Sequence, residues 1–128
     1  MEHDTLAKLL SAMKNAESRG KLELAVMPVS RVIKQVLEIL KKEEYIKDYE
    51  LVGEKRTVLK VQLNGTINNI GAIKPRYPIT LADYERYESR YLPAKDFGRL
   101  IVSTSKGVMT HIEAKAKNLG GALLAFVY

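Results

Sequence analysis

The spacing of apolar residues predicts two helices in the first half of the chain. The first lies between a cap at Asp4 or Thr5 and a stop at Arg19-Gly20, and its apolar residues recur at helical spacing: Leu6, Leu9, Leu10, Met13 and Ala16. Ser30 caps the second helix, and an apolar stripe runs along one of its faces: Val29, Val32, Ile33, Val36, Leu37 and Leu40. Each helix therefore has one apolar face to bury.

Alternating apolar residues predict three strands around these helices. Leu22, Leu24 and Val26 alternate with more polar neighbours as a half-buried strand, and Met27-Pro28 ends it. Residues 45–51 and 57–63 form a hairpin that turns at Gly53-Glu54-Lys55-Arg56. Residues 1–64 are thus predicted to form an N-terminal αβαββ domain.

The second half, residues 65–128, is predicted to be a mostly β domain with short helices. It follows Asn64-Gly65; residues 66–71 show no clear period, and prolines keep residues 72–79 extended. Thr80 and Asp83 cap a short helix that carries tyrosines on one face: Tyr84, Tyr87 and Tyr91. A connector between Pro93 and Gly98, the strand 99–102, a helix capped by Thr110 with Glu113 and a final strand complete an α+β protein of two small domains.

A hydroxyl-rich loop follows the apolar strand 99–102. It begins at Ser103, where the strand ends, and brings together Ser103, Thr104, Ser105, Lys106 and Gly107. Short hydroxyl side chains can reach base edges, ribose hydroxyls or phosphates of folded RNA. The competing interpretation is an ordinary strand-to-helix turn in which the hydroxyls bond their own backbone.

Charge favours a polyanionic partner. The 128-residue chain has a net charge of +6; residues 1–64 hold 12 basic and 10 acidic side chains, and residues 65–128 hold 9 and 5. Zero cysteines exclude disulfides and thiolate metal sites and suit a reducing cytoplasm. The acidic start Met1-Glu2-His3-Asp4 and the short apolar runs predict neither a secretory signal nor a membrane span.

Enzyme motifs are incomplete. Ser103 to Lys106 match S-x-x-K, but the serine ends a strand and the companion motifs of serine acylases are missing. His111 would have to act as the base of a hydrolytic triad from a position directly after a helix cap, and no serine lies in a nucleophile motif. His3 and His111 alone make no convincing metal site. Gly65 and Gly71 are not followed by the G-K-[ST] of a phosphate-binding loop, so nucleotide hydrolysis is not supported. We therefore expect no catalysis, metal, cofactor or small-molecule substrate.

Motifs along the whole chain resemble the universal small-subunit ribosomal protein family eight. The most specific is 103–114, followed by Leu119-Gly120-Gly121-Ala122 and the residues to Tyr128. Asp4 to Ala7, Lys14 to Ala16 and Met27 to Ser30 also resemble the family. Lys74-Pro75-Arg76-Tyr77 and Thr110-His111 are similar to archaeal and eukaryotic members, whereas bacterial members usually have an acidic residue at His111.

The resemblance implies RNA contacts. In the family the 103–107 loop makes base-directed contacts, and the first helix and the start of the second helix touch RNA. Family members often carry glutamate after the paired glycines; here Ala122 stands in its place, so that contact is not carried over. Gly120 and Gly121 either let backbone approach RNA closely or end the preceding helix.

The expected function is a structural constituent of the small ribosomal subunit that binds the central domain of its RNA, promotes platform assembly and works in the cytoplasm beside other ribosomal proteins. Beyond the loop and the paired glycines, the candidate RNA-binding residues are Lys8, Lys14, Asn15, Ser30, Arg31, Lys55, Arg56, Lys74, Arg76 and Tyr77. Solvated polar faces are the ordinary alternative for these residues. Two other functions remain open: a translational repressor that binds a messenger RNA mimic of the ribosomal site, and a protein-interaction module docking through the tyrosine helix and the final strand.

Overall fold

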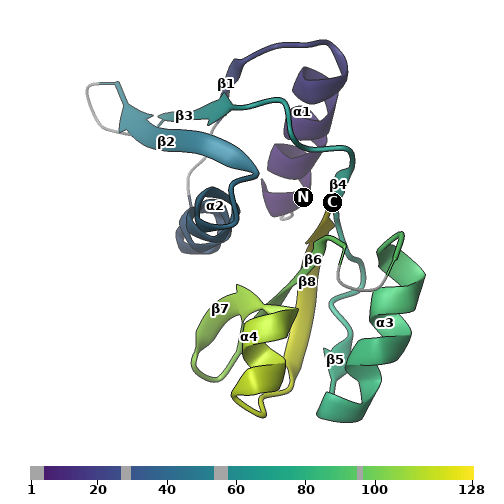
Figure 1. The fold of residues 1–128 in the computed structure, drawn as a ribbon. Helices are drawn as coiled ribbons and strands as arrows, with labels where there is room; N and C mark the ends of the chain where they lie inside the picture. The colour runs from purple at the N-terminus through teal and green to yellow at the C-terminus, as the bar shows by residue number, and fades with distance from the viewer. Residues whose placement is uncertain (1–4, 27–29, 54–57, 95–96) are drawn as a thin grey trace. The chain divides into compact units, whose positions relative to one another are not determined.

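The computed structural model describes residues 5–26, 30–53, 58–94 and 97–128 (Figure 1). The chain forms two compact units, residues 1–68 and 69–128. The sequence pattern predicts the division at Asn64-Gly65. Residues 64–67 lie with the first unit because the side chains of Asn64 and Thr66 each donate to the Glu44 carbonyl at 3.2 Å, and Ile67 is buried.

The first unit has the predicted αβαββ order. Its elements are α1 (Thr5–Ser18), β1 (Glu23–Val26), α2 (Arg31–Lys42), β2 (Ile46–Val52) and β3 (Val58–Leu63). The three strands form an antiparallel sheet in the order β1-β3-β2. α1 packs beside β1 and α2 packs beside β2. Asp4, Met27, Pro28 and Val29, which the sequence assigns to the ends of these elements, lie outside the described residues.

Both helices of this unit bury the predicted faces. All five apolar residues predicted for α1 are buried, as are four of those predicted for α2: Ile33, Val36, Leu37 and Leu40. The Ser30 hydroxyl accepts from the Ile33 N–H at 3.2 Å, which confirms the cap. Leu22 is the exception. It precedes the edge strand β1 and is 71% exposed instead of alternating into the core.

Helix α2 is tied to β2 by a tyrosine. The Tyr49 hydroxyl donates to the Glu38 carboxylate at 2.7 Å, and Lys41 forms an ion pair with Asp48 at 3.1 Å. Partial burial and the neighbouring Glu38 carboxylate raise the pKa of Tyr49 to about 12. The phenol therefore stays a hydrogen-bond donor throughout the physiological pH range.

The second unit is mostly β with short helices, as predicted. Its elements are β4 (Ile70–Ala72), β5 (Pro78–Ile79), η1 (Leu81–Asp83), α3 (Tyr84–Tyr91), β6 (Arg99–Thr104), β7 (Gly107–Thr110), α4 (His111–Ala116) and β8 (Gly121–Val127). Four strands run in the order β4-β8-β6-β7, and β5 also pairs with β8. Every pairing is antiparallel.

The sequence pattern misses two of these strands. β4 has three residues, too few for alternation to show, and it forms because Ile70–Ala72 pair with the distant Val127–Ala125 of β8. β7 lies in the segment predicted as a loop between Ser103 and the Thr110 helix. Pairing across a tight turn decides its structure.

Tyr84 is among the largest fully buried side chains in the core of the second unit. This ring is fully buried among residues of α3, α4 and the sheet, including Leu100, Val102 and Leu123. Its hydroxyl donates to the Leu119 carbonyl at 2.8 Å. Tyr87 is also buried and Tyr91 is half-buried, so the tyrosine face of α3 points mainly into the core. In the described parts of the chain, no helix combines the length and apolar character that would span a bilayer.

Two predicted caps hold the helices of this unit. The Asp83 carboxylate accepts from the Thr80 N–H at 2.8 Å, and this bond lowers the pKa of Asp83. The Thr110 hydroxyl accepts from the Glu113 N–H at 3.2 Å at the start of α4. The Glu113 carboxylate binds Lys117 at 3.0 Å.

Candidate nucleic-acid interface

The segment 103–107 is a tight β-hairpin, so its prediction as a loop is wrong. β6 continues through Ser103 and Thr104, and Thr104 pairs directly with Gly107, the first residue of β7. Only Ser105 and Lys106 lie at the tip, and both are exposed. Gly107 has φ +114°, a backbone conformation that is strained for residues with a side chain. Glycine at this position therefore allows β7 to begin directly after the two tip residues.

The hydroxyls of the hairpin divide into two kinds. The Thr104 hydroxyl donates to the Gly107 carbonyl at 2.8 Å and accepts from the Lys106 N–H at 3.1 Å. It therefore stabilises the turn, as the alternative interpretation of the loop expects. The hydroxyls of Ser103 and Ser105 and the Lys106 ammonium bond no group among the described residues. The tip thus presents one hydroxyl and one ammonium to an outside partner.

The paired glycines lie against β5 and against the part of β6 next to the hairpin tip. A Cβ added to Gly121 would collide with the Ser103 carbonyl oxygen, and one added to Gly120 would lie 2.5 Å from the Ile79 carbonyl. Both glycines therefore allow strands to approach closely inside the unit. They do not end α4. The left-handed residue that follows the helix is Asn118, with φ +57°, and the next N–H, that of Leu119, donates to the Ala114 carbonyl at 2.9 Å.

The first unit carries a separate set of candidate contacts. Lys8, Lys14 and Asn15 are exposed on α1. Arg31 is exposed at the first residue of α2, beside the capping hydroxyl of Ser30. Helix N-termini favour anions. The other two candidates of this unit, Lys55 and Arg56, lie outside the described residues.

Tyr77 is less available than the sequence pattern suggests. Lys74 and Arg76 are exposed, but the half-buried Tyr77 ring stacks on Tyr87 with centroids 5.5 Å apart. The Arg90 guanidinium lies 5.7 Å from the Tyr77 centroid. Arg90 is not among the residues predicted from the sequence; its position three residues after Tyr87 on the tyrosine helix is the signal that points to it.

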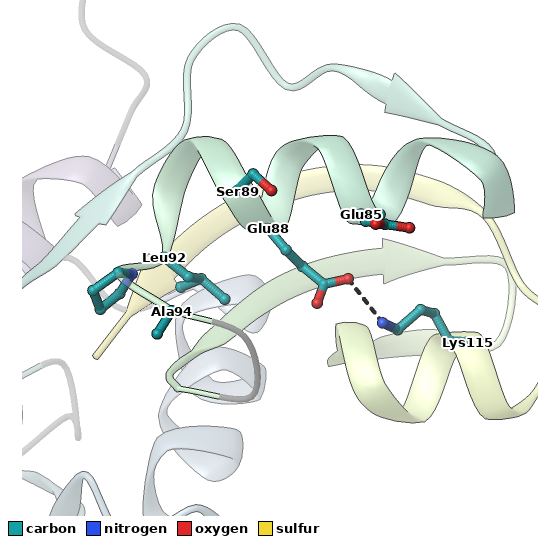
Figure 2. Close-up of a pocket in the computed structure, with 7 residues that line it drawn as sticks. Glu85, Glu88, Ser89, Leu92, Ala94 and Lys115 are labelled. Atoms are coloured by element: carbon teal, nitrogen blue, oxygen red, sulfur yellow. Dashed lines mark hydrogen bonds and ion pairs between the residues drawn. The ribbon is translucent and has the colours of Figure 1, made fainter.

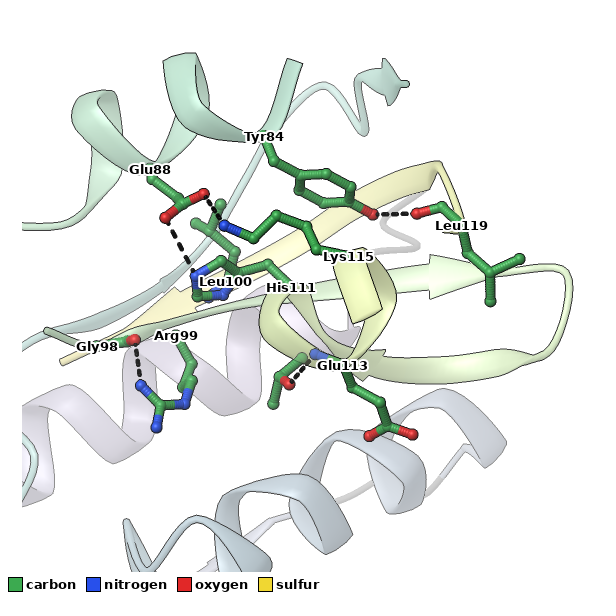
Figure 3. Close-up of polar contacts among 10 residues, drawn as sticks. Tyr84, Glu88, Gly98, Arg99, Leu100, His111, Glu113, Lys115 and Leu119 are labelled. Atoms are coloured by element: carbon green, nitrogen blue, oxygen red, sulfur yellow. Dashed lines mark hydrogen bonds and ion pairs between the residues drawn. The ribbon is translucent and has the colours of Figure 1, made fainter. Parts of the chain in front are cut away.

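A buried histidine lies beside the hairpin strands (Figure 3). His111 is 2% exposed, its Nδ1 accepts from the Leu100 N–H at 3.0 Å, and its Nε2 lies 3.5 Å from Glu88 Oε1. The other Glu88 oxygen accepts from the Lys115 ammonium at 2.8 Å. Burial lowers the pKa of His111, although the Glu88 carboxylate acts in the opposite direction.

A surface pocket of about 490 Å³ lies next to this network (Figure 2). Its lining includes the carboxylates of Glu85 and Glu88 and the ammonium of Lys115, which binds Glu88. Of the predicted RNA-binding residues that the structure describes, none lines it. The two carboxylates disfavour a phosphate there. Within the described ranges, no three His, Cys, Asp or Glu side chains gather as metal ligands would.

Comparison with known proteins confirms the resemblance inferred from the sequence motifs. The family model for ribosomal protein S8 matches residues 4–128. The small ribosomal subunit protein uS8 of Thermoplasma acidophilum is 47% identical over 129 residues, covering 100% of both chains. The proteins of the same name from Picrophilus torridus and Nanoarchaeum equitans are each 46% identical with the same full coverage. All three relatives are archaeal, in agreement with the predicted archaeal or eukaryotic type.

Proposed function

Because this chain belongs to the ribosomal protein S8 family and is a structural constituent of the small ribosomal subunit, we propose that it binds the central domain of the small-subunit RNA. The family consists of ribosomal structural proteins and is not a family of enzymes. Binding to the central domain promotes assembly of the platform, and the protein acts in the cytoplasm next to other ribosomal proteins.

The observation that carries the proposal is the hairpin tip. Ser105 and Lys106 are exposed, and among the described residues neither side chain has a partner. The rest of the hairpin is fixed by strand pairing and by the Thr104 hydroxyl. A tip held in one shape reads an irregular RNA surface with little loss of conformational entropy. Ser105 therefore contacts a base edge or ribose, and Lys106 contacts a phosphate.

Cations outside the tip supply attraction that does not depend on sequence. Lys8 and Lys14 on α1 and Arg31 on α2 are exposed, as are Lys74 and Arg76 in the second unit. Contacts of this kind release counterions from RNA, so their contribution falls as salt rises. Selection by the tip depends less on salt because it rests on short-range hydrogen bonds.

We expect Ser105→Ala to weaken binding to a central-domain RNA fragment by roughly 1–3 kcal/mol, the cost of losing one good polar contact. Binding to an unrelated structured RNA should change little, because the phosphate-contacting cations remain. Titrations of both RNAs with labelled fragments measure the two effects. Ser105 is exposed, so the free energy of unfolding should change by no more than about 0.5 kcal/mol.

Ser89→Ala is the matched control, since Ser89 is an exposed serine of the same unit that lies on α3 beside the acidic pocket. It should leave both affinities unchanged. If Ser105→Ala weakened binding to both RNAs equally, or weakened binding to neither RNA, the hairpin tip would have no role in selecting the RNA.

A further inference from the structure

The hairpin strands leave one backbone donor without a strand partner. β7 pairs with β6 as far as Thr110, opposite Ile101, and the chain then turns into α4. Leu100 lies one residue beyond this pairing, and its buried N–H still needs an acceptor. His111 Nδ1 provides it at 3.0 Å. The imidazole thus continues the β6–β7 pairing by one further bond.

The same ring joins the hairpin strands to α3. His111 Nε2 faces Glu88 Oε1 at 3.5 Å, and Glu88 Oε2 binds Lys115 of α4 at 2.8 Å. Figure 3 shows His111 and Lys115 converging on the one Glu88 carboxylate. Glu88 has only 15% of its side chain exposed, so these contacts are partly shielded from water. A single side chain therefore links β6, α3 and the start of α4.

The geometry requires a neutral imidazole. An Nδ1 that accepts from the Leu100 N–H has no proton of its own, so the proton of the neutral ring is on Nε2, toward Glu88. A second proton on Nδ1 would face the Leu100 N–H and break that bond. The charged groups that face the ring come from three elements: Glu88 of α3, Lys115 of α4 and Arg99 of β6.

We propose that His111 is a positioning residue for RNA selection: its bond to Leu100 and its contact with Glu88 fix the base of the β6–β7 hairpin and so the placement of its tip. The proposal rests on the proposed function of that tip. His111 itself is too buried to contact RNA directly. Its effect passes through the two strands, since β7 connects His111 directly to Gly107 and the tip.

The sign of the pH effect follows from this arrangement. Burial lowers the pKa of folded His111 below its ordinary value of 6.5. The unfolded chain therefore binds this proton more readily than the folded protein does. The stabilising contribution is complete above pH 6.5 and is lost as the pH falls through the lowered pKa. Selective RNA binding should decline over the same acidic range, whereas attraction through lysines and arginines persists.

The test measures the affinity ratio between the central-domain fragment and an unrelated RNA from pH 7.5 down to the most acidic pH at which the protein stays folded, for the wild type, His111→Asn and Glu88→Gln. We expect the wild-type ratio to fall roughly fivefold, the equivalent of one hydrogen bond. Asparagine can still accept from Leu100 but does not titrate, so its ratio should stay level. Glu88→Gln removes the carboxylate that favours protonated His111, so its decline should move to more acidic pH.

Amide hydrogen exchange of the free proteins accompanies these titrations. The protection factor of the Leu100 amide, which is the intrinsic exchange rate at each pH divided by the observed rate, should fall on acidification in the wild type and not in His111→Asn. Identical pH profiles of the affinity ratio for all three proteins would overturn the positioning role while leaving selective binding intact. A wild type that shows no preference at pH 7.5 would instead overturn the proposed function, and this inference with it.

Discussion

Tyr84→Ala is expected to destabilise the second unit by about 3–5 kcal/mol, the range for removing a buried aromatic side chain. Tyr84 is 0% exposed, and it belongs to the same buried cluster as the strand residues Leu100 and Leu123. Its hydroxyl also donates to the Leu119 carbonyl at 2.8 Å, next to the end of α4. Alanine leaves both a cavity and an unpaired carbonyl. Denaturant unfolding followed by circular dichroism measures the loss.

Tyr84→Phe separates the two contributions. Phenylalanine keeps the ring and removes only the hydroxyl, so we expect a cost of about 1–3 kcal/mol for the unpaired Leu119 carbonyl. Burial raises the pKa of Tyr84, so the hydroxyl remains a donor at neutral pH and this difference should not change between pH 6 and 8. Equal costs for alanine and phenylalanine would show that packing of the ring contributes little.

Gly121→Ala is expected to cost roughly 3 kcal/mol, the upper end of the range for overpacking. The added Cβ would collide with the Ser103 carbonyl, which is backbone and moves only if β6 and β8 separate. Ser103 pairs with Ala122 in these strands, so the disturbance reaches the hairpin close to its tip. A lowered midpoint of thermal unfolding would report it.

Gly71→Ala is the matched control for Gly121→Ala. Gly71 also lies in a strand that pairs with β8, but its added Cβ would lie 3.1 Å from the end of the Phe126 side chain, so a shift of a few tenths of an ångström by a side chain is enough. We expect a cost below about 1 kcal/mol. A Gly121→Ala protein as stable as Gly71→Ala would contradict the close approach of β8 to β6.

Sequence pattern was sufficient where the signals are local. The apolar faces of α1 and α2 and the Ser30 cap lie within single helices, and the structure has them as predicted. β4 and β7 were missed because three or four residues are too few for an alternating pattern to show. Their strand conformation depends on pairing, with the distant β8 for β4 and across a tight turn with β6 for β7.

Sequence motifs propose the residues of the candidate site but do not show their arrangement. Sequence motifs selected Ser103 to Gly107, yet they could not distinguish the inward hydroxyl of Thr104 from the exposed one of Ser105, because pairing with β7 sets that difference. The motifs also left His111 without a structural role. Its bond to Leu100 joins residues 11 positions apart, and only the three-dimensional arrangement of β6 and α4 reveals it.

The most direct test of the central claim compares binding of the wild-type protein to a central-domain fragment of small-subunit RNA and to an unrelated structured RNA of equal length across a salt series. We predict much tighter binding to the first RNA, with a preference that persists as salt rises and phosphate attraction weakens. Equal affinities that fall together with salt would contradict selective recognition and leave only a basic protein with general affinity for RNA.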